Sequence, residues 1–276
     1  MTDVSVVDRA LAHVARTATG APVAGHWRVT VHFHPDRLMD GRPLLAHLAS
    51  DGTYRSQFET GTSNGGLTAH PGGDRWRWEQ RIFGAAYDDA PPADRPKYGS
   101  LNHRARPAGG SVRFGSAHLR LAADTLARTT FCYPDSVFEP SAFGTAAHAG
   151  LVTLADEDEK DLLDDYVEAH VHGQLLLVRD VEAVVLDPAF RGTAVEEAAD
   201  RLPVPVEWHH GFRLAVAELE HHPDYRGPEV VAAGRAIAQD GVLDARVVGE
   251  AVAADRFDPQ TMKRVWHCVA RFGGPA

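Results

Sequence analysis

Strict alternation of polar and apolar residues in two short stretches constrains the fold of this chain more than any other feature. In residues 27–34 (WRVTVHFH) apolar residues alternate with a threonine and two histidines, His32 and His34. Successive side chains of a β-strand point to opposite faces, so this period of two predicts a half-buried strand with both histidines on its polar face. The dipeptide Pro35-Asp36 is expected to end it.

The second alternating stretch is residues 166–172 (YVEAHVH). Its apolar residues share one face of the expected strand, and Tyr166, Glu168, His170 and His172 share the other. A lone glutamate in a strand is ordinarily turned to solvent, but a whole row of polar neighbours favours a functional site. The apolar run 181–186 (VEAVVL) predicts a further strand.

Helical periodicity marks both ends of the chain. Residues 3–18 repeat apolar side chains at helical spacing and predict an amphipathic helix. From about residue 195 the sequence becomes helical again. Pro228 stands at an expected first helical position, Asp244 at an expected cap, and Asp258-Pro259 at the start of the last helix.

The centre of the chain is harder to assign. Residues 43–50 predict a short helix, and 112–121 and 127–133 predict strands. Residues 54–110 are rich in glycine, proline and aromatics, which is typical of a functional loop or of short strands. Residues 156–165 carry seven acids and are expected to begin a solvated helix.

Composition excludes several classes of protein. The 276 residues are 44% hydrophobic and 24% charged, and no apolar run approaches the roughly 20 residues that cross a bilayer, so no membrane partner is expected. The net charge of −10 argues against sequence-independent nucleic-acid binding, which depends on neutralising phosphates. Cys132 and Cys268 form no disulfide framework, and the N-terminus has no basic or apolar leader. These features predict a cytoplasmic protein with reduced thiols.

One motif resembles a serine nucleophile. Gly61-Thr62-Ser63-Asn64-Gly65 matches G-x-S-x-G, which needs a buried strand before the serine and a helix after it. Here polar residues precede it and a glycine- and proline-containing stretch follows it. We therefore interpret Ser63 and Asn64 as part of a glycine-flanked loop that contacts a ligand.

The paired histidines suggest a metal as an alternative. His32 with His34 and His170 with His172 each share one strand face, so four imidazoles and Glu168 could converge on zinc. This would give a zinc-dependent hydrolase, although no HExxH motif or cysteine ligand accompanies the histidines.

Nucleotide motifs of the common kinds are missing. No G-x-G-x-x-G follows a strand, and there is no Walker A pattern. Arginines and aromatics interleave in residues 75–87, which we expect to form a surface strand.

Several long stretches carry a family resemblance. They are VTVHFHPDR (29–37), DGTYRSQFETGTSNGG (51–66), RPKYGSLN (95–102), RFGSAHLRL (113–121), YVEAHVHG (166–173) and VEAVVLDPAFRGT (181–193), with DYRGPEVV and KRVWHCVARFG near the C-terminus. These stretches resemble an uncharacterised bacterial family, domain of unknown function number 3626. The resemblance covers most of the chain and implies no particular activity.

The order of elements also resembles the ADP-ribosyltransferase fold, in which two small sheets enclose an NAD-binding cleft. In that fold an early strand supplies a histidine or arginine, a middle strand a small hydroxyl residue or tyrosine, and a late strand the catalytic glutamate. The matching positions are His32 or His34, then Ser116, then Glu168. The chain departs from the pattern where His170 and His172 follow the glutamate, and where the usual Gly-Thr and Ser-Thr-Ser runs are missing.

The resemblance implies that NAD is the substrate and that Glu168 is catalytic. Cleaving nicotinamide from NAD builds oxocarbenium-like charge on the ribose, and a fixed carboxylate beside the sugar stabilises it. His32 is then expected on the adenosine ribose, Arg55 on the pyrophosphate, and Tyr54, Phe58 or Tyr98 against nicotinamide. The other expected binding residues are His34, Gln57, Ser63, Asn64, Ser116 and His170.

Two further points stay open. Glu59 either shares the binding face of Arg55 and Gln57 or only holds Arg55 in an ion pair. Arg95, Lys97 and Arg113 are reserve phosphate contacts.

Taken together, the sequence predicts an α+β protein with an ADP-ribosyltransferase-like split β-sheet core over residues 1–195, which includes an N-terminal helix, and a helical C-terminal region over 196–276. The expected function is transfer of ADP-ribose from NAD to a protein or other nucleophile, or NAD hydrolysis. The alternatives are the zinc-dependent hydrolase and a degenerate, non-enzymatic binding module that uses residues 75–87.

Overall fold

The computed structural model describes residues 4–61 and 68–276, and these divide into two compact units. Unit 1 comprises Met1–Val31, Gly52–Ser111 and Leu119–Glu182. Unit 2 comprises His32–Asp51, Val112–His118 and Ala183–Ala276. The chain therefore passes between the units several times. The expected division into a core over 1–195 and a C-terminal region over 196–276 stays a prediction.

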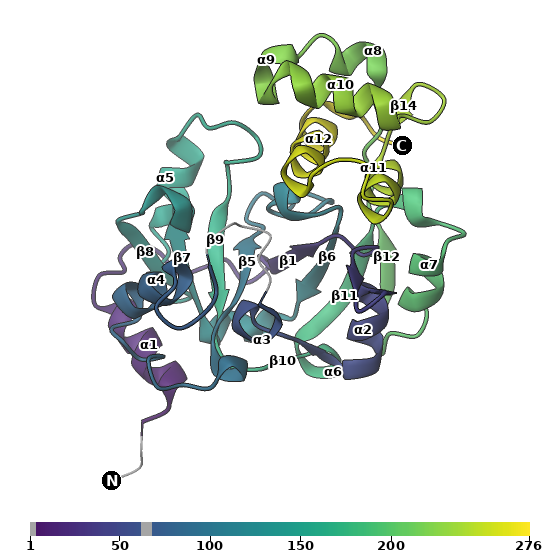
Figure 1. Cartoon of the computed structure of the whole chain (residues 1–276). Coiled ribbons are helices and arrows are strands. Elements are labelled where there is room, and N and C mark those ends of the chain that lie inside the picture. The colour runs from purple at the N-terminus through teal and green to yellow at the C-terminus, as the bar shows by residue number, and fades with distance from the viewer. Residues whose placement is uncertain (1–3, 62–67) are drawn as a thin grey trace. The chain divides into compact units, whose positions relative to one another are not determined.

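Unit 1 contains an antiparallel sheet in the order β1-β5-β9-β7-β8 (Figure 1). Its strands are β1 (Val29–Phe33, of which Val29–Val31 belong to unit 1), β5 (Lys97–Leu101), β7 (Thr129–Tyr133), β8 (Ala142–Thr145) and β9 (Val167–Val171). The register places Glu168 opposite Ser100 on one side and opposite Cys132 on the other. The alternating stretches predicted as strands are thus confirmed as β1 and β9.

Both faces of this sheet are buried, which corrects the expectation of half-buried strands. Every residue of β1, β7 and β9 is shielded from solvent. Helix α1 (Val6–Ala15) packs on β7 and β8, and its Ala10 and Val14 join Trp78 and Cys132 in one apolar cluster. The polar residues of β1 and β9 are therefore buried as well.

Helix α4 (Asp74–Ile82) corrects the expectation of a surface strand in residues 75–87. Its buried residues, Arg75, Trp78, Glu79 and Ile82, recur three and four positions apart, so they lie on one helix face. The buried face of α4 thus carries two charged side chains, and both have partners within unit 1.

The acidic run at 156–165 follows a helix instead of beginning one. Helix α5 (Leu151–Glu157) ends where the run starts, and the acids continue into turns. Asp165 accepts from Arg104 and Arg106, and Asp158 pairs with Lys160. The run is therefore used for local ion pairs.

The remaining elements of unit 1 are short. They are β4 (Thr53–Tyr54), α3 (Gln57–Thr60), the 3-10 helices η1 (Pro92–Asp94), η3 (Ala123–Arg128) and η4 (Ser136–Phe138), β10 (Leu175–Leu176) and α6 (Leu177–Asp180). Residues 54–110 therefore contain helices as well as strands. Strands β6 (Ala117–Leu121) and β11 (Val181–Leu186) are divided between the units.

Unit 2 is mostly helical, as expected for the C-terminal region. Its helices are α2 (Leu44–Asp51), α7 (Ala194–Ala199), α8 (Val216–Leu219), α9 (Pro223–Arg226), α10 (Pro228–Ile237), α11 (Ala245–Ala253) and α12 (Pro259–Phe272), with the 3-10 helices η2 (Val112–Phe114) and η5 (Pro188–Phe190). Pro228 begins α10, and the side chains of Asp244 and Asp258 cap α11 and α12, which confirms these three predictions. Helix α12 packs on α10 and α11, and its Trp266 indole donates to the carbonyl of Val112.

Unit 2 also contains short strands, β2 (Leu38–Met39), β3 (Arg42–Pro43), β12 (Val206–Trp208), β13 (Leu214–Ala215) and β14 (Val242–Leu243). The last three lie within residues 196–276, where the sequence predicts helices. Strand β12 runs parallel to β11, with Val206 opposite Val184. The predicted strand over 112–121 is also shorter, because η2 occupies its first residues.

Helices and a large mixed sheet together make the chain an α+β protein, as predicted. Across residues 4–61 and 68–276, none of the helices has the length and apolar character that a membrane span requires.

Candidate functional site

The candidate site is the polar face of three neighbouring strands in unit 1. Residues that lie directly opposite each other in antiparallel strands point to the same face. The register therefore gathers six side chains, which we call the polar face: Tyr98 and Ser100 from β5, Glu168 and His170 from β9, and Thr130 and Cys132 from β7. Helix α4 lies over them, with the Trp78 ring 6.5 Å from the His170 ring.

Glu168 is the most heavily bonded member of the polar face. Its Oε2 accepts from the backbone N–H of Ser136 at 3.2 Å and from the Ser136 hydroxyl at 2.9 Å. Its Oε1 lies 2.9 Å from Nε2 of His170 and 3.9 Å from the guanidinium of Arg75. Only 6% of Glu168 is exposed. The carboxylate is therefore fixed at both oxygens in a dry environment.

The electrostatics of Glu168 favour the ionised form. Burial alone would raise the pKa of this carboxyl, but the hydrogen bond and charge of His170, the charge of Arg75 and the Ser136 N–H lower the pKa below its ordinary value. The neighbouring Cys132 behaves in the opposite way, because burial and the Glu168 charge raise the pKa of its thiol well above the ordinary value. Cys132 is thus protonated at neutral pH.

Arg75 joins Glu168 to a second buried ion pair. Its guanidinium donates to the Ser136 hydroxyl at 3.1 Å and lies 4.0 Å from the centre of the Tyr98 ring. The Tyr98 hydroxyl donates to Glu79 at 2.8 Å, and Glu79 accepts from Arg95 at 2.7 Å. Burial raises the pKa of Glu79 to about 7, although Arg95 and Tyr98 oppose that shift.

This chain of contacts reaches helix α3. The Arg95 guanidinium lies 4.2 Å from the centre of the Phe58 ring. Next to Phe58, the amide oxygen of Gln57 is buried and has no hydrogen-bond partner within the described part of the chain. Ser56 and Glu59 form a capping box at the start of α3, so Glu59 serves the helix. The alternative expected for Glu59, an ion pair with Arg55, stays a prediction.

On its other side, Glu168 connects to a row of hydroxyls and imidazoles. Nδ1 of His170 lies 3.1 Å from the Thr130 hydroxyl, which lies 3.0 Å from Nε2 of His172. Nδ1 of His172 lies 2.7 Å from the Tyr87 hydroxyl. Burial lowers the pKa of His172 well below its ordinary value, so this imidazole is neutral.

The predicted NAD-binding residues divide into three groups. Tyr98 and His170 lie with Glu168 on the polar face. Tyr54 lies on β4, Gln57 begins α3, and the exposed Arg55 stands between them. Ser63 and Asn64 lie outside the described residues.

The remaining predicted residues belong to unit 2. His32 lies 3.1 Å from the Gly115 carbonyl, with its ring 5.1 Å from that of His118. The His34 ring lies 5.3 Å from that of Trp266, and the buried hydroxyl of Ser116 makes no hydrogen bond to any described residue. Burial lowers the pKa of His32 to about 3. That His32 and Glu168 share one pocket stays a prediction.

The reserve phosphate contacts have local roles. Arg95 is buried against Glu79, and the Lys97 ammonium donates to three carbonyls, those of Ala93, Arg95 and Gly173. Arg113 lies against the Phe114 ring. Arg95 and Lys97 are thus both engaged by partners within unit 1.

The sequence analysis did not identify several residues of the site, among them Cys132, Arg75 and Ser136. Cys132 belongs to the predicted strand 127–133, where alternation places it on the face of Thr130. Arg75 shares the helical spacing of Trp78 and Glu79, which was a usable signal. Ser136 follows the strand in an irregular turn, and no local pattern identifies it.

Within the described ranges, one group of residues has the spacing to hold a metal ion. The ligand atoms of Cys132, Glu168 and His170 all lie within 4.8 Å of one another, and all three residues are buried. This group contains only one of the four histidines in the two expected pairs. The histidine-pair zinc site therefore has no counterpart among the described residues.

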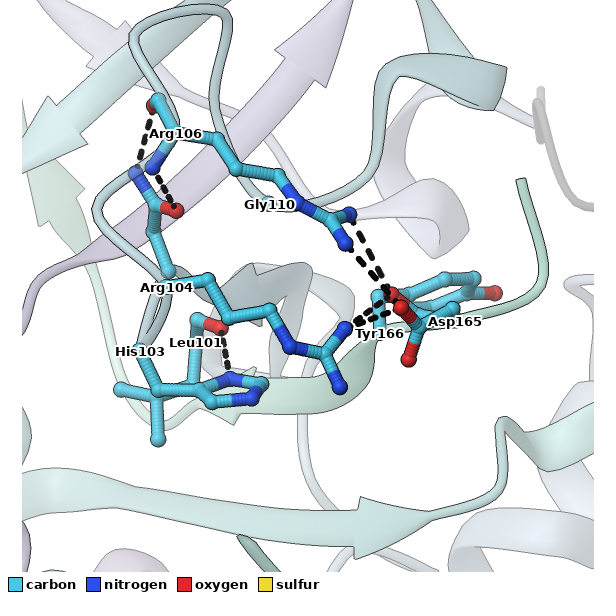
Figure 2. Close-up of a pocket in the computed structure, with 8 residues that line it drawn as sticks. Leu101, His103, Arg104, Arg106, Gly110, Asp165 and Tyr166 are labelled. Atoms are coloured by element: carbon cyan, nitrogen blue, oxygen red, sulfur yellow. Dashed lines mark hydrogen bonds and ion pairs between the residues drawn. The ribbon is translucent and has the colours of Figure 1, made fainter. Parts of the chain in front are cut away.

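A small pocket opens at the start of β9 (Figure 2). Its lining includes His103, Arg104, Arg106, Asp165 and Tyr166. Its empty volume, which includes the solvent-filled space at its entrance, is about 160 Å³. This is below the roughly 300–1,000 Å³ that is typical of ligand pockets. It is therefore too small to hold a dinucleotide.

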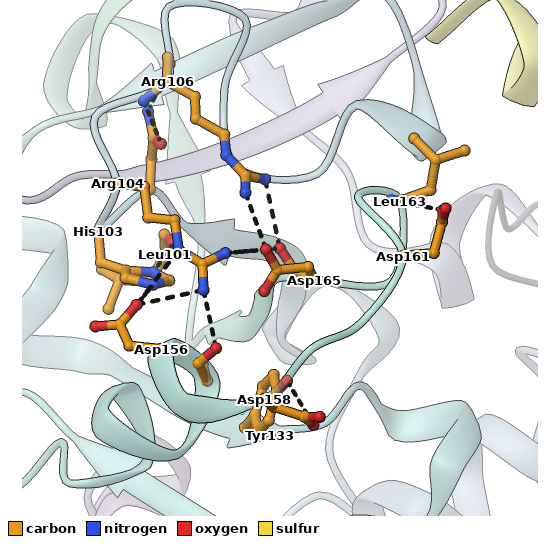
Figure 3. A network of polar contacts seen from close by, with 12 residues as sticks. Leu101, His103, Arg104, Arg106, Tyr133, Asp156, Asp158, Asp161, Leu163 and Asp165 are labelled. Carbon is orange, nitrogen blue, oxygen red and sulfur yellow. Dashed lines mark hydrogen bonds and ion pairs between the residues drawn. The ribbon is translucent and has the colours of Figure 1, made fainter. Parts of the chain in front are cut away.

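The charges around this pocket are already paired (Figure 3). Both arginines donate to Asp165, and Arg104 also pairs with Asp156, which in turn lies 3.1 Å from His103. The Tyr166 hydroxyl donates to Asp135, the residue before Ser136. This network therefore braces the strand and turn that hold Glu168.

Comparison with known proteins identifies the family. A search of curated proteins finds no match to this chain. The profile of the family described as "Protein of unknown function (DUF3626)" matches residues 28–159 and 146–269. Since the matched residues together run from 28 to 269, the chain belongs to this family.

Proposed function

We propose that the chain is an ADP-ribosyltransferase-like enzyme with a split-sheet core. It cleaves NAD and transfers ADP-ribose to a protein or other nucleophile, or to water. Glu168 is the catalytic residue in this proposal, and NAD is the substrate. The observation that carries it is the fixing of the Glu168 carboxylate by Ser136 on one oxygen and by His170 on the other.

The chemistry requires a carboxylate of this kind. The bond between ribose C1′ and the nicotinamide nitrogen breaks, and its electron pair leaves with nicotinamide. C1′ becomes positively charged until a nucleophile bonds to it and releases its proton to solvent. A preorganised carboxylate in a low-dielectric site stabilises that charge more strongly than water does.

The buried charge network supports placing NAD near α3. Of the predicted nicotinamide and pyrophosphate contacts, Tyr54 lies on β4, Phe58 lies on α3, and Arg55 stands between these two elements. From Phe58, contacts run through Arg95, Glu79, Tyr98 and Arg75 to Glu168. The buried amide oxygen of Gln57 has no hydrogen-bond donor among the described residues, so a carboxamide N–H or ribose hydroxyl of NAD would satisfy it.

Burial of Glu168 has a mechanistic consequence. A ribose can reach the carboxylate only if side chains of α4 move, and Arg75 and Trp78 are two of those that lie against the polar face. Substrate binding is therefore coupled to displacement of α4. Both cysteines are free and buried, in keeping with a cytoplasmic location, which we include in the proposal.

Nicotinamide release from NAD tests the proposal directly. Purified protein is incubated with NAD, with and without a lysate that supplies acceptors. We expect Glu168→Gln to lower turnover by about a hundredfold or more while the protein stays folded. Glu157→Gln is the matched control, because Glu157 is exposed at the end of α5.

Two results would decide against Glu168. One is wild-type turnover in the folded Glu168→Gln variant. The other is an equal loss in Glu157→Gln, which would point to a general effect of removing acids. Retention of NAD without nicotinamide release would instead support the binding-module alternative.

A further inference from the structure

We propose that Cys132, Glu168 and His170 form a site for a borderline transition-metal ion such as Zn²⁺. The site is on the polar face but does not rest on the NAD activity. Its basis is the convergence of a thiol, a carboxylate and an imidazole from two adjacent strands, β7 and β9.

The three candidate ligand atoms, Sγ of Cys132, Oε1 of Glu168 and Nε2 of His170, lie close to one another. Nε2 of His170 lies 2.9 Å from Oε1 of Glu168, and Sγ of Cys132 lies 3.9 Å from each of these atoms. In a cysteine–histidine–carboxylate catalytic triad, the thiol and the carboxylate contact opposite nitrogens of the imidazole. Here both contact the same nitrogen, so the arrangement does not relay a proton from thiol to carboxylate.

The spacing suits a tetrahedral metal. Zinc lies about 2.0–2.2 Å from nitrogen and oxygen ligands and about 2.3 Å from sulfur. At tetrahedral angles these bond lengths put neighbouring ligand atoms roughly 3.4–3.6 Å apart. The observed separations of 2.9 and 3.9 Å bracket this value, so shifts of about half an ångström complete the geometry.

The surroundings already orient each ligand. Metal-binding histidines usually hydrogen-bond through their second nitrogen, and Nδ1 of His170 lies 3.1 Å from the Thr130 hydroxyl. Oε2 of Glu168 is held by Ser136, which leaves Oε1 for the metal. Cys132 is fully buried in the apolar cluster that includes Trp78.

The charges also balance. Zn²⁺ would be neutralised by the Glu168 carboxylate and by the Cys132 thiolate. The thiol proton is released to solvent on binding, and so is the proton that Nε2 of His170 directs at Glu168, which frees this nitrogen for the metal. The Arg75 guanidinium keeps its 3.9 Å contact with Glu168 and its stacking on Tyr98. A sulfur ligand selects zinc, cobalt or copper over magnesium and calcium, which prefer oxygen.

Cobalt substitution provides a test that uses neither NAD nor turnover. The full chain is freed of metal with a chelator and titrated with Co²⁺, and thiolate-to-cobalt absorption is recorded in the near ultraviolet. We expect one Co²⁺ per chain with this absorption, and its displacement by one Zn²⁺. Because many surface histidines can bind metal weakly, the thiolate band is the decisive signal.

Two cysteine variants separate this site from any other. Cys132→Ser should abolish the band, and Cys268→Ser should keep it, since Cys268 is the second buried free thiol. A band that survives Cys132→Ser, a band lost equally in Cys268→Ser, or no band in the wild-type chain would each overturn the site.

A third variant covers the case in which Cys132→Ser does not fold. Thr130→Val keeps all three ligands and removes the hydroxyl beside Nδ1 of His170. Loss of such a partner typically weakens metal binding by about 10- to 100-fold, measured by competition with a chromogenic chelator. Unchanged zinc affinity in Thr130→Val together with an unfolded Cys132→Ser would reject the proposal. Failure of the NAD test would leave all these results untouched.

Discussion

Ser136 holds Glu168 twice, through its backbone N–H at 3.2 Å and its hydroxyl at 2.9 Å, both on the oxygen Oε2. The serine begins the 3-10 helix η4, just after β7, so it approaches the carboxylate from outside the sheet. The double contact fixes Glu168 in one orientation and directs Oε1 toward His170.

Replacing the serine measures what this contact contributes. We expect Ser136→Ala to lower the free energy of unfolding by about 1.5–3 kcal/mol, the usual range for a hydrogen bond to a charged group. If Glu168 acts on NAD, kcat should fall by about tenfold with KM unchanged, since orientation of the carboxylate matters in the transition state.

Chemical denaturation and nicotinamide release measure these two effects. Ser50→Ala is the control, because its hydroxyl is exposed and bonds locally at the end of α2. A stability change in Ser136→Ala no larger than in Ser50→Ala would show that the hydroxyl does not hold the carboxylate. A rise in KM at constant kcat would assign Ser136 to substrate binding instead.

Unit 2 should lose stability in acid because of its buried histidines. Burial lowers the pKa of His32 to about 3 and that of His267 to about 3, and the charges of Arg226, Arg113, Lys263 and His34 add to the effect at His267. The unfolded chain takes up these protons near pH 6.5. The contribution of these two histidines to the free energy of unfolding is therefore complete above pH 6.5. It falls as the pH drops toward about 3, by up to about 1.4 kcal/mol per pH unit for each histidine.

His267 is the best position for testing this slope. Both ring nitrogens are buried and have no hydrogen-bond partner among residues 4–61 and 68–276. Leucine can therefore replace the ring without removing a hydrogen bond to these residues. Between pH 6.5 and 4.5, His267→Leu should lose about 2 kcal/mol less of its free energy of unfolding than the wild type loses.

Free energies of unfolding at several pH values are compared between His267→Leu and the wild type. Asp187 affects stability in the opposite direction. Burial raises its pKa to about 6, so its contribution to the free energy of unfolding falls as the pH rises from about 4 to 6. An acid slope in His267→Leu as steep as that of the wild type would show that this histidine is protonated equally in both states.

Movement of α4 should be visible through Trp78. The indole ring lies 6.5 Å from the His170 ring, and its buried N–H has no hydrogen-bond partner within the described part of the chain. If NAD displaces α4 from the polar face, adding NAD should change tryptophan fluorescence, and Trp78→Phe should remove most of that change.

Trp208→Phe is the control for the same titration, since Trp208 lies on β12 in unit 2. A fluorescence change of full size in Trp78→Phe would mean that NAD binds without disturbing α4 at this position. The proposed route to Glu168 would then be wrong.

The polar row of β9 was predictable from the sequence, but its burial was not. Alternation alone put Glu168 and His170 on one face. Their cover, α4, carries Arg75 and Glu79 on its inner side, so it does not look like a buried helix by hydrophobicity. The charges that make this burial tolerable come from distant positions, since Arg75 pairs with Glu168 and Glu79 pairs with Arg95.

The proposed metal ligands, Cys132, Glu168 and His170, show the same limit of prediction from sequence even more clearly. A lone cysteine in the stretch TTFCY gives no spacing pattern, whereas paired histidines attract attention. Only the pairing of β7 with β9 places Cys132 directly opposite Glu168. Strand register is a long-range property, so no local window of the sequence contains it.

The chain crosses five times between the two units, and this bears on how the protein can be dissected. Each unit is assembled from three separate stretches, and β1, β6 and β11 each cross from one unit to the other. No single cleavage of the backbone leaves both units whole. Truncation or limited proteolysis will therefore give fragments that must reassociate before they fold, and each half will have to be studied by point substitution within the intact polypeptide.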